Sequence, residues 1–306
     1  MNNKIFSAAL LAISVSTAVM ADPITVSGVT WDPDVGADFD AGSSVYETAL
    51  DSGDDGIFGD VSDGSGGFTN DDVSTTLSGY GQISDINGKG AFTGTGDGFC
   101  QSGCQLTFAF GGYELDIASS TFGANSEFRF TGGWVNWYVD NGTIMDFSDP
   151  ASLTMADAID GTLWLSLAGH LNYDIDSGSF ATLAGDGTFV GTGSDTGDGG
   201  GLLDVAVAGG VGNPNAGEIG TANENFDTDG RSDSNGVVPN GVQGFADLQF
   251  TSTFSPAKVA TADGMVLEGD VDFSGDTIAV PEPSSLALLG LGLLGLGFRG
   301  RRKSAK

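Results

Sequence analysis

The chain has 306 residues, 51 of them glycine, and its 41 acidic against ten basic side chains give a formal net charge of −31. A chain this acidic is repelled by nucleic acid and by anionic membrane surfaces, so no nucleic-acid partner is expected. Its 20 phenylalanines and four tryptophans supply core material, which argues against disorder throughout.

Residues 1–21 have the order of a secretory signal peptide. Lys4 precedes an apolar run over residues 5–15, and a stretch of small residues then ends at Ala21. Export machinery recognises this order of charge, apolar run and small residues. We expect signal peptidase to cleave between Ala21 and Asp22. The alternative is a buried N-terminal helix.

Residues 22–279 are predicted to form one acidic, β-rich extracellular domain. Apolar and polar residues alternate along most of it, most clearly at 134–140, 162–170 and 265–273, which is the period of strands. Further strands are expected near 24–30, 75–86, 104–117, 126–131, 179–192, 202–208 and 245–254. Asn-Gly and Asp-Gly pairs between them favour hairpin turns. We therefore predict an all-β fold, a β-sandwich, with the jelly roll as one candidate arrangement.

Four segments depart from the strand pattern. Residues 150–160 are predicted to be helical, because Asp149 is suited to cap a helix and Pro150 to its first position. Residues 51–72, 191–201 and 209–244 are rich in glycine and polar residues and are predicted to be long loops.

Cys100 and Cys104 are the two cysteines of the chain, separated by three residues. Export makes a disulfide the expected state of an isolated pair. A metal site would need more ligands, and His170 is the one histidine. We therefore predict a disulfide.

The sequence argues against catalysis. His170 falls within a predicted strand, where a histidine is more often a structural hydrogen-bonding residue, and no nucleophile elbow or zinc spacing occurs. Paired carboxylates hydrolyse glycosides, but among 41 acids some pair always lies at a useful distance. Aromatic side chains at 134, 137, 138 and 164 suit either sugar platforms or core packing. We expect no enzyme; the alternative is a secreted carbohydrate-active enzyme or a calcium-dependent polysaccharide-binding module.

Calcium is the one cofactor that the sequence suggests. Asn225, Asp227 and Asp229 alternate before a glycine and Asp233 follows, like part of a calcium loop. However, Arg231 stands where an acid would be expected, and no glutamate closes a twelve-residue loop. The alternative is a solvated turn.

The C-terminus has three consecutive parts. Pro281, Glu282 and Pro283 come first, and an uncharged apolar stretch, 284–298, follows. A basic tail, 299–306, ends the chain and contains Arg299, Arg301, Arg302 and Lys303. A helix over 284–298 spans roughly 22 Å, short of a ~30 Å hydrocarbon core, but it can lodge in a membrane that thins around it. The basic tail should stay on the cytoplasmic side.

Residues 280–306 resemble the PEP-CTERM sorting signal in all three parts. The resemblance implies recognition by an exosortase, an integral membrane enzyme similar to Cys transpeptidases. It also implies transient anchoring by a transmembrane helix at 284–298, removal of the tail, and delivery to the cell surface or extracellular matrix.

The body also resembles flocculation-associated PEP-CTERM proteins. The resemblance rests on a Cys-x-x-x-Cys before residues 106–112 and on the stretch from Phe245 to Phe254 upstream of the tag. It implies a structural or adhesive role in biofilm or floc formation, with extracellular polysaccharide as the partner. It implies no catalytic residues.

Overall fold

The computed structural model describes residues 23–33, 39–48, 76–91, 98–100, 104–116, 118–121, 126–140, 142, 145–174, 179–188, 196–207, 209–232 and 245–278. The predicted signal peptide with its Ala21–Asp22 cleavage site lies outside these residues. So do the predicted loop at 51–72, the predicted helix at 284–298 and the whole of 280–306.

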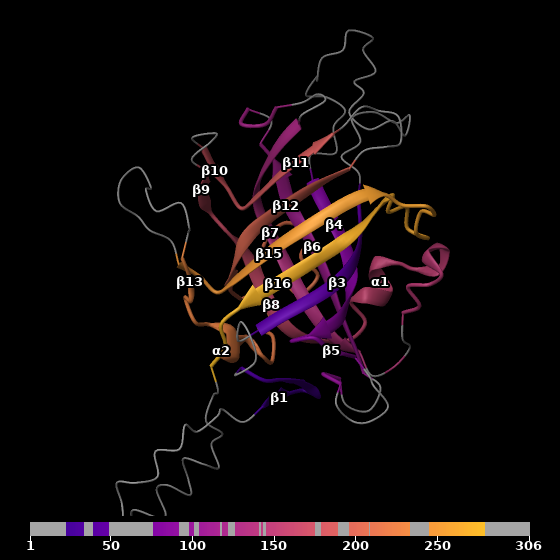
Figure 1. Cartoon of the computed structure of the whole chain (residues 1–306), viewed down its shortest axis with the longest axis vertical. Helices are drawn as coiled ribbons and strands as arrows, with labels where there is room; N and C mark the ends of the chain where they lie inside the picture. The colour runs from indigo at the N-terminus through magenta and orange to yellow at the C-terminus, as the bar shows by residue number, and fades with distance from the viewer. Residues whose placement is uncertain are drawn as a thin grey trace, which may run out of the picture.

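The described strands form a closed barrel (Figure 1). Each strand is antiparallel to the next, and the last pairs with the first, β16 with β3, over the full length of both. The strands of the wall are β3 (Phe39–Glu47), β4 (Thr76–Ile86), β6 (Gln105–Leu115), β7 (Ser126–Asp140), β8 (Thr162–His170), β11 (Leu183–Thr188), β12 (Thr196–Val205), β15 (Leu248–Pro256) and β16 (Leu267–Gly275).

Two of these strands share one place in the wall. Residues 134–139 of β7 pair with β8 and residues 126–130 pair with β11. On the other side, residues 202–205 of β12 pair with β8 and residues 196–201 with β11. A small hairpin, β9 (Asn172–Asp174) with β10 (Ser179–Ala181), separates the two in sequence. The barrel therefore has eight strand positions, which follow one another in chain order.

The prediction of a β-sandwich is wrong. The pairing of β16 with β3 joins the two ends of one sheet, so there are not two facing sheets. Strand β3 was not among the predicted strands, because Gly42, Ser43 and Ser44 interrupt its apolar pattern. Without that strand the sequence offered the last strand no second partner that would close the sheet. Alternation reveals one buried face, but it does not say whether that face lies between two sheets or inside one closed sheet.

Aromatic side chains fill one end of the barrel. Trp137 lies 4.9 Å from Phe273 between ring centroids, and both are buried. The hairpin of β1 (Ile24–Val26) and β2 (Val29–Trp31) brings in Trp31, whose ring is 5.4 Å from that of Phe226 in α2 (Asn223–Phe226). Both elements lie at the lower end of the barrel in Figure 1. We call this the plugged end.

A second apolar cluster lies outside the barrel, over β4, β6, β7 and β8. It includes Tyr80, Tyr138 and Trp134, whose Nε1 donates to the Val211 carbonyl at 3.0 Å. The helix α1 (Met155–Ala158) packs there. The face of β7 opposite to the lumen is therefore also buried, as the predicted alternation at 134–140 allowed.

Several predicted elements need correction. The segment 150–160 is helical as predicted, but only in two single turns: the 3-10 turn η2 (Pro150–Ser152), where Asp149 stands at the N-cap without a side-chain hydrogen bond, and α1, which Thr154 caps. The segment 191–201 is not all loop, because β12 begins at Thr196. Predicted strands 126–131 and 134–140 are one strand, β7. The remaining short strands are β5 (Lys89–Gly90), which pairs with β4, and β13 (Arg231–Ser232), which pairs with β14 (Phe245–Ala246).

Glycines within the strands make room for aromatic rings. Gly79 and Gly81 of β4 lie opposite Phe110 and Phe108 of β6. A Cβ atom at Gly81 would lie 2.4 Å from Phe108 Cζ, and one at Gly79 would lie 2.6 Å from Phe110 Cζ. The phenylalanine rings of β6 therefore cover the backbone of β4 at these two glycines. Both glycines lie in the strand predicted at 75–86, where they shape the wall of the barrel.

Candidate functional site

The lumen holds a cavity of about 80 Å³ at the end opposite to the plugged end. Seven phenylalanines contribute to its wall, among them Phe108, Phe110 and Phe273. Among its polar lining residues, Glu47 is the last residue of β3 and Tyr113 is near the end of β6, whereas Ser252 lies within β15 and Asp198 within β12. The wall is thus mostly apolar, with Glu47 and Tyr113 toward the end of the barrel.

A bulge in β6 brings Tyr113 to the cavity. Phe108 and Phe110 face the lumen, and strict alternation would next place Gly112 there. The pairing with β4 shifts between Leu77 and Gly79, and Gly112 has a φ of +68°, which glycine adopts without strain. The ring of Tyr113 then lies over Gly133, where a Cβ atom would be 2.2 Å from its Cε1.

Tyr113 and Glu47 are both buried and both lack partners. The Tyr113 hydroxyl has no hydrogen-bond partner among the described residues, and burial raises the pKa of its phenol. Glu47 is 9% exposed, and burial raises the pKa of its carboxyl from 4.5 to about 8. No hydrogen bond joins that carboxyl to another part of the described chain. At neutral pH Glu47 is therefore mostly protonated, and it can donate as well as accept a hydrogen bond.

Sequence reasoning missed both residues. Glu47 continues the alternation of Phe39, Ala41 and Val45, so the period of two does place it on the buried face once β3 is accepted as a strand. For Tyr113 no such signal exists, because its orientation depends on the bulge at Gly112.

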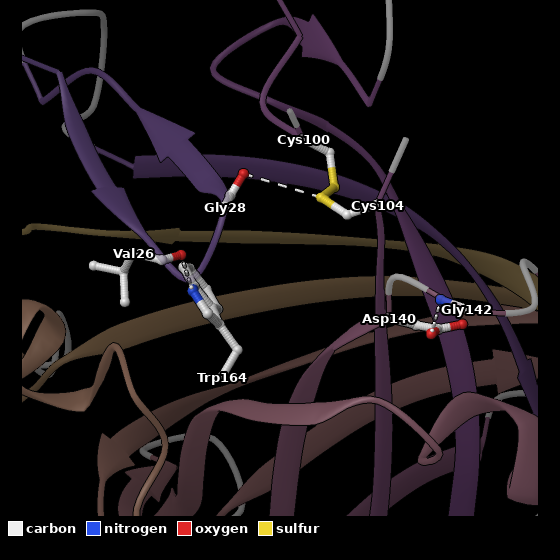
Figure 2. Close-up of a disulfide and its surroundings, with 7 residues drawn as sticks. All are labelled: Val26, Gly28, Cys100, Cys104, Asp140, Gly142 and Trp164. Atoms are coloured by element: carbon white, nitrogen blue, oxygen red, sulfur yellow. Dashed lines mark hydrogen bonds between the residues drawn. A yellow bond between two sulfur atoms is a disulfide. The ribbon is translucent and has the colours of Figure 1, made fainter. Parts of the chain in front are cut away.

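The predicted disulfide is present. Cys100 and Cys104 are joined, with their Cα atoms 5.4 Å apart (Figure 2). Cys104 Sγ lies 4.0 Å from the Gly28 carbonyl oxygen, and the backbone of Cys100 forms an isolated antiparallel β-bridge with that of Val29. Beside them, Trp164 Nε1 donates to the Val26 carbonyl at 3.0 Å. The two cysteines of the disulfide therefore contact the β1–β2 hairpin at the plugged end, away from the cavity.

The predicted calcium ligands are not gathered in the described part of the chain. Asn225 is buried, and its Nδ2 donates to the Ile278 carbonyl at 2.9 Å. The Asp229 backbone N–H donates to Asp247 at 2.8 Å. Within the described ranges, no group of three or more His, Cys, Asp or Glu side chains could hold a metal ion. Asp233 lies outside them, so the calcium prediction stays untested.

Asp247 organises this region instead. Its buried carboxylate accepts from the backbone N–H groups of Val205 at 2.7 Å and Thr228 at 2.7 Å, as well as from Asp229. These bonds lower the pKa of Asp247, but burial outweighs them and the net shift is upward.

The remaining candidate residues have structural contacts. His170 Nδ1 lies 2.8 Å from Asp204 Oδ1, where β8 pairs with β12. Trp134, Trp137, Tyr138 and Trp164 are each at most 4% exposed, so none presents a free ring face to a sugar.

One comparison with known proteins gave a match. The family model of the PEP-CTERM protein-sorting motif matches residues 279–303. The chain carries a PEP-CTERM sorting domain. The match contains Pro281, Glu282 and Pro283, together with the basic residues from Arg299 to Lys303. A PEP-CTERM motif marks an exported protein that an exosortase processes, with transient anchoring through the C-terminal region. Neither the curated proteins nor the solved structures contain a match to this chain.

Across the described residues, no helix is long and apolar enough to cross a membrane. The predicted span at 284–298 lies outside them.

Proposed function

We propose that this PEP-CTERM protein is a structural or adhesive component of an extracellular polysaccharide matrix and has no catalytic role. The observation that carries the proposal is the sorting motif on a chain whose body is strongly acidic. Residues 22–283 hold all 41 acidic residues and four of the ten basic ones, so their formal charge is −37. Such a body remains hydrated and dispersed outside the cell.

The closed barrel suits an exposed module. A closed sheet leaves no free strand edges along its wall, and free edges are the sites at which β proteins pair with other chains. Carboxylates are close together on the outer face of β3, β4 and β16. Burial raises the pKa of Asp272, and repulsion from Asp40, Asp270 and Asp85 raises it further. We propose that this face carries counter-cations within the hydrated polymer.

Two features support the non-catalytic part of the proposal. The one histidine is bonded to Asp204, and the tryptophans that would serve as sugar platforms are buried. We propose contact with polysaccharide through the acidic outer surface rather than through a cleft.

Deletion of the gene in its native organism tests the proposal. We expect weaker cell aggregation and less polymer retained on the cells, with the polymer chains unchanged in length. Complementation with the native chain should restore both, whereas a chain lacking residues 280–306 should restore neither. Unchanged aggregation would contradict the matrix role. A change in polymer chain length would instead favour a carbohydrate-active enzyme.

A further inference from the structure

Two unpartnered polar groups line the same apolar cavity. Tyr113 is 1% exposed and Glu47 9% exposed, and both border the cavity in the lumen. A buried polar group without a partner destabilises a fold, so native structures nearly always satisfy such groups with protein, water or a ligand. The Tyr113 hydroxyl is buried and has no partner among the described residues, and the Glu47 carboxyl, whose oxygens are not fully enclosed, makes no hydrogen bond within them either.

The two groups lie on either side of β4. Glu47 pairs with Gly79 of that strand, and Tyr113 pairs with Leu77. Their backbones are therefore two strand spacings apart, roughly 10 Å. Both residues line the cavity, with the ring of Tyr113 over Gly133 of β7, so a molecule in the cavity borders both residues.

The two polar groups lie nearer the open end of the cavity than several of its phenylalanines. Along β16, Leu267 is level with Glu47, whereas Phe273 is level with Ala41, six residues deeper in the barrel. Phe108 is likewise deeper than Phe110 and Tyr113 along β6. Phe130 of β7 pairs with Leu115 and so lies beyond Tyr113, but Phe108 and Phe273 lie deeper than both polar groups. The deep part of the cavity therefore fits an apolar tail, and the two polar groups lie where a polar head would be.

We propose that this cavity binds a small uncharged amphiphile, with an alkyl tail of a few carbons among the phenylalanines and a hydroxyl or carbonyl head at Tyr113 and Glu47. The volume of about 80 Å³ sets the size of the tail. It is roughly half that of a cavity known to take up benzene, so a short linear chain fits better than a ring. This inference is independent of the matrix role.

The negative charge of the body and the burial of Glu47 disfavour ionised heads. A body with a formal charge of −37 repels an anionic head. Asp198, the other carboxyl on the lining, is an exposed residue of β12, so inside the lumen a cationic head would be paired only if Glu47 gave up its proton, which burial opposes. A neutral head takes the hydrogen bonds that both groups offer and requires no change of charge.

Three probes with the same pentyl tail test the proposal: pentan-1-ol, hexanoate and pentylammonium. Each is titrated calorimetrically into the protein released from cells without detergent, since detergent tails would compete for the lumen. We expect pentan-1-ol to bind one site and each charged analogue to bind at least tenfold more weakly. Equal binding of a charged analogue would overturn the assignment of an uncharged ligand, and absence of pentan-1-ol binding would mean that the cavity holds only water.

A pair of Tyr→Phe variants locates the site. Tyr113→Phe should weaken pentan-1-ol binding by roughly three- to tenfold, the usual effect of one hydrogen bond. Tyr80→Phe is the matched control, because its hydroxyl donates to Asp263 on the outside of the barrel at 3.0 Å. The control should leave the affinity unchanged. Equal affinities for both variants would show that the alcohol binds elsewhere and would overturn the proposal.

Discussion

Replacement of Glu47 by glutamine should stabilise the protein, and increasingly so as the pH rises. Burial raises the pKa of this carboxyl from 4.5 to about 8. Below pH 4.5 the folded and unfolded chains both hold the proton, and Glu47 has no effect on the pH dependence. Between pH 4.5 and about 8, the pKa values of Glu47 in the unfolded and folded chains, only the folded chain keeps the proton. The folded state then binds more protons than the unfolded state, so stability falls as the pH rises.

The size of the effect follows from that shift. Each pH unit between 4.5 and 8 removes about 1.4 kcal/mol of stability. The native chain should therefore lose about 3 kcal/mol by pH 7 and about 5 kcal/mol above pH 8 relative to a chain that cannot ionise there. Glu47→Gln has nearly the same shape and no charge, so it should escape this loss.

Urea unfolding of both proteins at pH 4, 5.5, 7 and 8.5 measures the difference. We expect a free-energy gap close to zero at pH 4 that widens at each step. Glu114→Gln is the control for the loss of one negative charge, because Glu114 is an exposed glutamate on β6. Parallel pH profiles for the native chain and Glu47→Gln would refute the reasoning.

Three further predictions concern the wall and the plugged end. Tyr80→Phe should lower the free energy of unfolding by about 1 kcal/mol because it loses the hydrogen bond to Asp263, whereas Tyr113→Phe should leave that free energy unchanged or raise it. Urea unfolding midpoints compare the two variants, and an equal loss of stability would mean that the Tyr113 hydroxyl has a partner. Gly81→Ala should destabilise the barrel by about 1–3 kcal/mol, because its Cβ would meet Phe108, whereas Gly90→Ala, whose Cβ would have its nearest contact at 3.9 Å, should not. Thermal melting distinguishes the two variants, and equal melting temperatures would contradict the close packing at Gly81. Reduction of the Cys100–Cys104 disulfide should lower the free energy of unfolding by about 2 kcal/mol at most, because the loop is short, and should leave the circular dichroism of the strands intact. Loss of that signal would mean that the disulfide is required for folding.

Strand bounds and turns were well predicted where they depend on residues that are close in sequence. The strand predicted at 162–170 is β8, with the same bounds, and the one at 75–86 differs from β4 by one residue. The Asn87-Gly88 pair forms the expected turn, since both residues have positive φ. These predictions depend on the period of side chains and on the chemistry of two turn residues, which neighbours in sequence determine.

The closure of the barrel could not be predicted in the same way. It depends on β3, whose Gly42 and Ser43 resemble loop residues until Asp85 and Asp272 are known to lie beside them. Likewise, Gly197 and Gly201 look like loop residues, but each lies opposite a phenylalanine of β15. Strand partners and register are properties of the folded chain, and so is the cavity that they enclose.

The central claim, that this barrel is delivered through its C-terminal tail, is tested most directly by mass spectrometry of surface and inner-membrane fractions. Cells making the native chain are compared with cells making a variant with alanine at Pro281, Glu282 and Pro283. We predict that the native protein reaches the surface without residues 284–306, whereas the variant stays at full length in the inner membrane. Recovery of both proteins at full length in the membrane fraction would contradict sorting by an exosortase.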